Sequence, residues 1–143
     1  MFQSYWRLSR SLSLDVRACV RDAQGRVALV RLPDSAIWQF PGGTVEQGET
    51  AAGALSRLLF KDTRIEGVGE ATLFAVYAGT QGARFDQRAL FLVPSWRRLD
   101  AGMVNAQADM AFFEAGRLPH DADPAVPVRL AEISRARALS EVW

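Results

Sequence analysis

The residues best suited to chemistry lie in one short segment that begins with a pair of glycines. Gly42 and Gly43 follow a proline, and adjacent glycines allow a backbone to turn sharply or to approach a ligand closely. Thr50 can cap a following helix, whose start carries a partial positive charge. Arg57 and Lys61 add full positive charges to that helix. Together these groups predict a site for a small phosphate-containing ligand.

Within this segment, Gly43, Glu49 and Arg57 are separated by five and then seven residues. That spacing resembles the first half of the Nudix box, G-x5-E-x7-R-E-U-x-E-E-x-G-U, in which U is an aliphatic residue. The preceding residues 38–43 and the order of strand-like runs also fit, so the chain resembles the Nudix hydrolase family over about residues 15–140. The resemblance implies an α+β fold, the Nudix fold, in which a mixed β-sheet is sandwiched between helices.

The resemblance also implies a reaction and a cofactor. Nudix hydrolases cleave nucleoside diphosphates linked to another group, with water as the nucleophile and Mg²⁺ or Mn²⁺ as the metal. The glutamates that follow the box arginine lie at i, i+3 and i+4, so one helix face presents a carboxylate cluster to the metal. At these positions, and at the glycine that ends the box helix, this chain has Leu58, Lys61, Asp62 and Arg64.

These departures predict that the metal site is lost. Leu58 can neither bind a metal nor accept a proton, and Asp62 has a shorter stem than glutamate. Lys61 places an ammonium where a divalent cation is expected, and at about 4 Å such charges repel by a few kcal/mol at intermediate dielectric. We therefore expect no Mg²⁺ or Mn²⁺ to bind at millimolar concentration, with Asp62 as a metal ligand at most. The candidate catalytic residues are Glu49, Arg57 and Asp62, and the candidate ligand-binding residues are Gly42, Gly43, Arg57 and Lys61.

Each box residue also has a structural interpretation. Leu58 continues an apolar helix stripe and is expected in the core. Glu49 and Arg57 are expected to form an orienting pair that holds the helix against the preceding loop. Lys61 is either solvated or a phosphate contact, and Asp62 is expected to be a surface carboxylate at the helix end.

Two groups outside the box could also meet a ligand. Aromatic side chains could stack on a base, although strand alternation favours the core for at least one of Phe74 and Tyr77. This first group comprises Trp38, Phe74 and Tyr77. The polar face of one strand is expected to be solvated, with contact to an anionic ligand as the alternative. This second group comprises Arg84, Asp86 and Arg88.

The elements that position these residues follow from apolar runs and turn residues. Strands are expected at 16–21, 26–32, 38–40, 70–78, 84–93 and 110–113, with a loop at 97–109. The first two strands should form a hairpin, because residues 22–25 have a turn composition. Helices are expected at 50–63 and 128–139. Arg64 either takes the left-handed position at the end of the first helix, at a cost of about 1 kcal/mol, or the helix ends elsewhere.

Length and composition favour one domain. The chain has 143 residues, enough for one core, so we expect a single domain over 1–143 with an N-terminal arm at 1–13. A net charge of +1 provides no field that would attract nucleic acid or an anionic membrane. Cys19 is the one cysteine, which excludes an internal disulfide and fits a cytoplasmic location; it is expected to be buried and inert. His120 is expected to be an exposed loop residue.

Three functional hypotheses remain open at this point. The first is a Nudix hydrolase of nucleoside diphosphate derivatives whose activity is weak or absent. The second is a non-catalytic or regulatory module that binds a nucleotide or another phosphate ligand. The third is a structural subunit that forms a homodimer, as many Nudix proteins do. Metal dependence separates the first from the others, and ligand-induced stabilisation separates the second from the third.

Overall fold

A computed structural model describes residues 12–99 and 108–143. Its centre is a four-stranded sheet in the order β3-β1-β6-β5, formed by Gly42–Thr44, Leu14–Val20, Gln87–Val93 and Thr72–Ala78. Strand β1 runs parallel to β6, whereas β3 and β5 are antiparallel to their neighbours, so the sheet is mixed. Two smaller sheets pair β2 (Val27–Arg31) with β8 (Asp109–Phe113) and β4 (Ile65–Gly67) with β7 (Trp96–Arg98).

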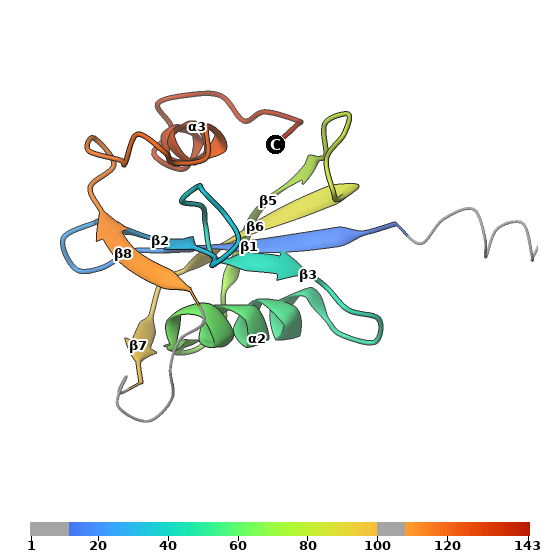
Figure 1. Cartoon of the computed structure of the whole chain (residues 1–143), viewed down its shortest axis with the longest axis horizontal. Coiled ribbons are helices and arrows are strands. Elements are labelled where there is room, and N and C mark those ends of the chain that lie inside the picture. Colours follow the sequence, from blue (N-terminus) through green and yellow to red (C-terminus); the bar gives the residue numbers. More distant parts are fainter. Residues whose placement is uncertain (1–11, 100–107) are drawn as a thin grey trace, which may run out of the picture.

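Two helices cover opposite faces of the central sheet (Figure 1). Helix α2 (Ala51–Thr63) lies on one face and α3 (Ala125–Ile133) on the other. Because side chains of a strand alternate between faces, the core is divided in two. Val16 and Phe91 pack on the α2 side, and Cys19 and Leu90 pack on the α3 side. This is the expected α+β arrangement of a mixed sheet between helices.

Helix α2 forms where the sequence predicts it. Thr50 Oγ1 accepts a hydrogen bond from Gly53 N at 3.0 Å, which satisfies one of the free amides at the helix start. The helix ends at Arg64, which adopts the left-handed conformation at φ 61° and donates its backbone N–H to Phe60 O at 2.9 Å. An arginine therefore occupies a position that favours glycine, at the expected cost of about 1 kcal/mol.

The expected hairpin of the first two strands is wrong. The turn forms, because Asp22 Oδ1 accepts bonds from the backbone N–H groups of Gln24 and Arg26 at 3.0 and 2.9 Å. Beyond a single bridge between Arg21 and Val27, however, β1 pairs with β3 and β6, whereas β2 pairs with β8. Strand β1 is buried on both faces, so it belongs at the centre of the main sheet with a neighbour on each side.

The boundaries of several other elements differ from the expectations. Residues 38–40 make two isolated bridges rather than a strand, and the strand forms at β3 instead. The loop expected at 97–109 overlaps the end of β7, and residues 100–107 lie outside the described part. The last helix begins three residues earlier than expected, at Ala125, and ends at Ile133 rather than at 139. It stops there because Arg135 takes the left-handed conformation at φ 62°.

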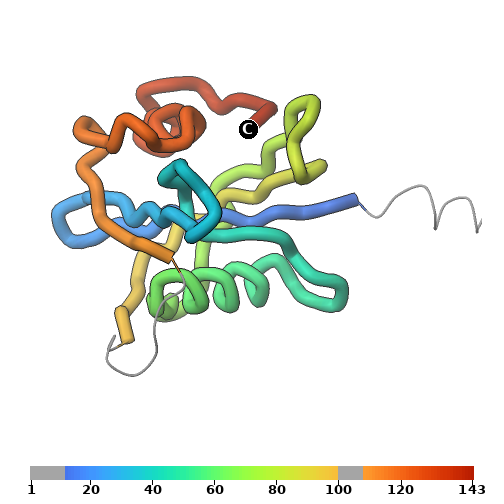
Figure 2. Tube along the Cα trace, viewed as in Figure 1, coloured from blue at the N-terminus to red at the C-terminus, as the bar shows by residue number. Residues whose placement is uncertain are grey.

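The segment after α3 returns to the central sheet (Figure 2). Ala78 N donates to Glu141 O at 2.9 Å, and Trp143 N donates to Ala78 O at 3.0 Å. The Trp143 ring then packs edge-on against Tyr77 and Phe40, with centroid distances of 5.4 and 6.2 Å. The C-terminal residues thus complete the core on the α3 side.

Two further expectations concern the chain ends and membranes. Most of the arm expected at residues 1–13 lies outside the described residues, which begin at position 12. Among the described helices, none has the length and apolar character needed to cross a membrane.

Candidate functional site

The structure brings Glu49 and Arg57 together in a two-pronged ion pair. Arg57 Nε donates to Glu49 Oε2 and Arg57 Nη2 to Glu49 Oε1, both at 2.8 Å. Glu49 Oε1 also accepts from the backbone N–H of Glu46 at 2.9 Å, and Arg57 Nη2 reaches Thr44 O at 3.3 Å. The hydrogen bonds from Arg57 hold the pKa of Glu49 at about 2, and the Glu49 carboxylate raises the pKa of Arg57. The pair ties the loop after β3 to α2.

Leu58, at the position where the resemblance implies the first metal-binding glutamate, is part of the core. Only 8% of it is exposed, as the sequence predicts for an apolar stripe residue. Its side chain lies over Gly43, so that a Cβ on Gly43 would be 3.3 Å from Leu58 Cδ2. We call Gly42-Gly43 the glycine turn. The space between it and the turn of α2 that carries Leu58 is therefore filled by hydrocarbon.

Asp62 and Lys61 differ sharply in exposure. Asp62 is 4% exposed, so the expectation of a surface carboxylate is wrong. It lies one helical turn after buried Leu58 and shares its face. Burial raises the pKa of Asp62, an effect that the charges of Lys61 and Arg17 partly offset. Lys61 is exposed, as its solvated interpretation predicts.

These residues do not fit a magnesium or manganese ion. A hard divalent cation needs several oxygen ligands, and this helix face offers one buried carboxylate beside an ammonium and a leucine. Across residues 12–99 and 108–143, no group of three acidic, histidine or cysteine side chains is placed to hold a metal. The donor set is therefore unlike that of the metal-binding box.

Gly42 and Gly43 face opposite sides of the central sheet. A Cβ on Gly43 would point at Leu58 of α2, whereas a Cβ on Gly42 would meet the Val16 carbonyl oxygen and lie 2.9 Å from Arg17 Cα. Gly42 also adopts φ 154°, which side chains rarely allow. The two glycines therefore border different faces of the sheet, Gly43 the α2 side and Gly42 the α3 side.

An open cavity of about 720 Å³ lies beside this turn and contains three arginines. We call it the arginine cavity; three carboxylates, Asp15, Asp34 and Asp123, line it together with Arg17, Arg84 and Arg88, and Gly42 and Phe85 also border it. Gly43 also lines it, whereas Arg57 and Lys61 do not. The structure therefore brings together only part of the predicted ligand-binding set. The two glycines lie beside arginines that the sequence analysis did not group with them.

The floor of the arginine cavity is a buried network around Asp15. Arg17 Nε donates to Asp15 Oδ1 at 2.8 Å and Arg17 Nη2 to Asp15 Oδ2 at 3.2 Å. Arg88 Nε donates to the same Oδ1 at 2.6 Å. Asp15 and Arg88 are directly paired positions of β1 and β6, and each of the three residues is no more than 8% exposed. The expectation of a solvated face at Arg84, Asp86 and Arg88 is therefore wrong for Arg88.

Sequence reasoning missed Asp15 and Arg17. A usable signal exists in the strand Leu14–Val20, where charged residues occupy alternate positions of an otherwise apolar run. In a strand buried on both faces, charged side chains require partners. The partner Arg88 lies 73 residues away, so the sequence alone could not identify it.

The three aromatic candidates do not line the arginine cavity. Tyr77 is completely buried, and burial, reinforced by Glu132, raises its pKa to about 12. Phe74 packs against the same core cluster because a bulge between Leu73 and Ala75 shifts the alternation of β5. Trp38 meets Phe113 edge-on at 5.1 Å and lies under Arg31.

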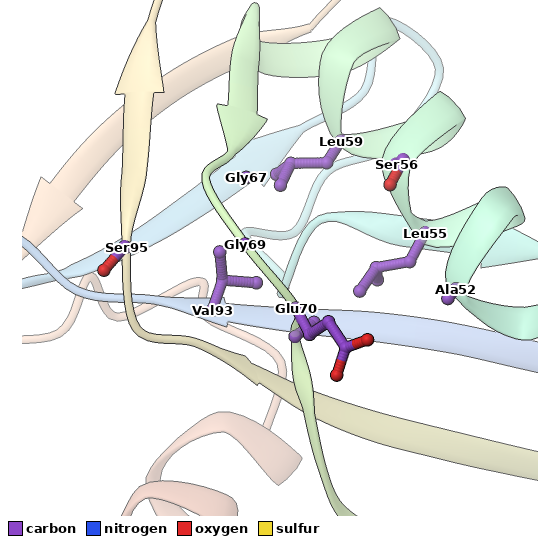
Figure 3. Close-up of a pocket in the computed structure, with 10 residues that line it drawn as sticks. Ala52, Leu55, Ser56, Leu59, Gly67, Gly69, Glu70, Val93 and Ser95 are labelled. Atoms are coloured by element: carbon purple, nitrogen blue, oxygen red, sulfur yellow. The ribbon is translucent and has the colours of Figure 1, made fainter.

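A second hollow, of about 410 Å³, lies between α2 and the segment that joins β4 to β5 (Figure 3). Leu55 and Leu59 of α2 and Val93 of β6 form its apolar wall, and Glu70 is an acidic group at its edge. None of the predicted site residues lines this hollow. Elsewhere, Cys19 is 3% exposed with a pKa raised by burial, and His120 is exposed, both as expected.

Several solved structures share this fold, and two of the three described below are named as NUDIX hydrolases. A MutT NUDIX hydrolase from Burkholderia pseudomallei matches 87% of this chain and 99% of its own, with TM-score 0.64 and 20% identity. A NUDIX hydrolase from Nitrosomonas europaea matches 88% and 90%, with TM-score 0.65 and 18% identity. An ADP-ribose pyrophosphatase from Streptococcus suis matches 93% and 96%, with TM-score 0.61 and 17% identity. At these identities the likeness shows the fold.

Sequence comparison provides the family. No curated protein matches the chain significantly in sequence. The model of the NUDIX domain, in contrast, matches residues 12–127, which include the glycine turn, the box helix and the arginine cavity. The chain therefore belongs to the NUDIX domain family.

Proposed function

We propose that this Nudix-family protein binds a small phosphate-containing ligand without a metal and lacks metal-dependent hydrolysis. The observation that carries the proposal is the packing of Leu58 against Gly43, with the buried Asp62 and the exposed Lys61 beside it. A carboxylate cluster that activates water through a bound metal cannot form from these side chains.

The arginine cavity supports retained ligand binding. It lies against the glycine turn and combines an open volume with three guanidinium groups, which form strong, charge-assisted hydrogen bonds to phosphates. Arginine charge can take over the neutralisation of phosphate that the metal provides in the family. Because Lys61 does not line this cavity, we assign the retained binding to the cavity rather than to the box helix.

The test compares binding with turnover. ADP-ribose is a suitable first probe, because the similar Streptococcus suis protein is named as an ADP-ribose pyrophosphatase. Thermal shift and hydrolysis are measured for ADP-ribose, ADP and diadenosine compounds, each with Mg²⁺, with Mn²⁺ and with EDTA. We expect stabilisation by at least one of these phosphates in EDTA and no hydrolysis under any condition.

Two outcomes would contradict the proposal. Metal-dependent hydrolysis that disappears in Asp62→Ala would show that Asp62 is a working ligand. The absence of stabilisation by any phosphate compound would favour the structural-subunit hypothesis, which size measurement in solution can then examine. Lys61→Ala is the matched control, and it should change neither binding nor turnover.

A further inference from the structure

The arginine cavity contains more guanidinium than its buried carboxylate can neutralise. Arg17 and Arg88 share the single side chain of Asp15, at 2.8 and 2.6 Å. Arg17 uses four of its five N–H donors, since its Nη1 also donates to Phe40 O at 2.9 Å and to Gln39 Oε1 at 3.1 Å. Asp123 also attracts Arg88 across the cavity, but Asp15 is the one carboxylate that is hydrogen-bonded to either arginine, and it is divided between the two.

Arg88 is the guanidinium with spare donors. Within residues 12–99 and 108–143, its one hydrogen bond is the bond from Nε to Asp15, and neither Nη1 nor Nη2 has a partner. Only 10% of the side chain is exposed, and the residue lines the cavity. Burial, followed by the repulsion from Arg17, lowers the pKa of Arg88 despite the attraction of Asp15 and Asp123.

The Arg88 side chain is also held in a fixed orientation. Its Cζ lies 3.8 Å from the centroid of the Phe85 ring and 4.8 Å from that of the Trp143 ring. Stacking on aromatic faces is favourable for arginine, and it leaves the in-plane N–H groups free to donate. Because the fork is already ordered, binding an anion loses little side-chain entropy.

We propose that Arg88, supported by Arg17, is the anchor for the phosphate group of a hydroxylated phosphate monoester in the arginine cavity. Asp34 and Asp123 line the same cavity. They repel a ligand that carries only negative charge, but their oxygens can accept hydrogen bonds from hydroxyl groups. Arg84, which is exposed and lines the cavity, adds positive charge. This inference deepens the proposed function, on which it rests for the presence of a phosphate ligand.

The experiment titrates the full-length protein in EDTA with ribose 5-phosphate, inorganic phosphate, ribose and acetate. We expect binding of ribose 5-phosphate to be salt-sensitive and at least several-fold tighter than binding of phosphate, with no response to ribose or acetate. Arg88→Gln should weaken ribose 5-phosphate at least ten-fold. Arg97→Gln is the matched control, because Arg97 lies on β7 and pairs with Glu66 away from the cavity. This variant should bind ribose 5-phosphate as tightly as the natural chain.

A readout on the unaltered protein keeps the test decisive if Arg88→Gln fails to fold. The Nε–Hε signals of Arg17 and Arg88 are followed by NMR during the titration, and both should shift while that of Arg97 stays fixed. An unchanged affinity in folded Arg88→Gln, unmoved Arg88 signals, or an equal response to acetate would each overturn the inference.

The two proposals can fail separately. Metal-dependent hydrolysis together with Arg88-dependent binding would refute the proposed function and leave the anchor intact. Phosphate binding that is lost in Lys61→Ala but kept in Arg88→Gln would refute the anchor and leave metal-free binding intact.

Discussion

The two sides of the central sheet differ in character around one shared turn, Gly42-Gly43. On the α2 side, Gly43 lies against Leu58, the hydrocarbon side chain at a position where the resemblance implies a glutamate. On the α3 side, Gly42 lies against Arg17 in a charged, open cavity. The motif associates this glycine pair with one function. Here each glycine has its own structural role: Gly43 packs against an apolar side chain, and Gly42 borders an ionic cavity. We therefore predict that the packing of each side can be perturbed with little effect on the other, although the charge of Arg17 acts on Asp62.

The largest expected effect separates the two glycines. In Gly42→Ala the added methyl would meet the Val16 carbonyl and Arg17 Cα at a backbone φ of 154°. We expect a loss of about 4 kcal/mol or more in the free energy of unfolding, or no folded protein. In Gly43→Ala the methyl meets only the end of the Leu58 side chain, at 3.3 Å, and the loss should be about 1 kcal/mol. Denaturant titration measures both, and equal losses would refute the separation of the faces.

The second prediction tests whether the ionic network supports the fold. Asp15→Ala leaves two buried guanidinium groups without their carboxylate, so we expect a loss of about 3–5 kcal/mol in the free energy of unfolding. The whole network can also be replaced with apolar residues, as in Asp15→Val with Arg17→Leu and Arg88→Leu. This triple variant should regain most of the lost free energy of unfolding, because no unpaired charge remains. A triple variant no more stable than Asp15→Ala would contradict this expectation.

The restoration of the box is the third prediction. Leu58→Glu, Lys61→Glu and Asp62→Glu together rebuild the carboxylate face, and we expect calorimetry to detect Mg²⁺ or Mn²⁺ binding by this variant and none by the natural chain. Stability should fall by about 1.5–3 kcal/mol, because Leu58 gives up its burial. A folded triple variant without metal binding would show that these positions are not the lost site. Ribose 5-phosphate binding should survive, since the change lies on the other side of the sheet.

The parts that could be predicted from sequence are local. The α2 cap at Thr50 and the Glu49–Arg57 pair depend on spacings of three and eight residues, and both formed. The partners of β2 and the Asp15–Arg88 bond depend on pairing across distant segments, for which one sequence carries no signal. The burial of Asp62 could have been predicted from the sequence, because Asp62 lies four residues after Leu58 on the same helix face.

The smallest expected effect is a difference in pH dependence between two carboxylates of the box segment. The pKa of Glu49 is lowered to about 2 from an ordinary value of 4.5. Its pairing therefore stabilises the fold above pH 4.5, and that stability is lost as the pH falls from 4.5 toward 2. The pKa of Asp62 is raised instead, so its ionisation opposes folding, and this penalty is relieved as the pH falls through the raised value.

The two substitutions that remove these charges should therefore shift stability in opposite senses. At pH 7, Glu49→Gln should lower the melting temperature slightly, since the pair is partly exposed to solvent. Asp62→Asn should leave the melting temperature unchanged or raise it, because a neutral amide is cheaper to bury than a carboxylate. Melting curves between pH 2 and pH 7 give the comparison, with both differences from the natural chain shrinking in acid as the carboxylates become protonated. A fall in stability at pH 7 in Asp62→Asn would mean that the buried carboxylate is stabilised by nearby positive charge, which would make the α2 side more ionic than its packing indicates.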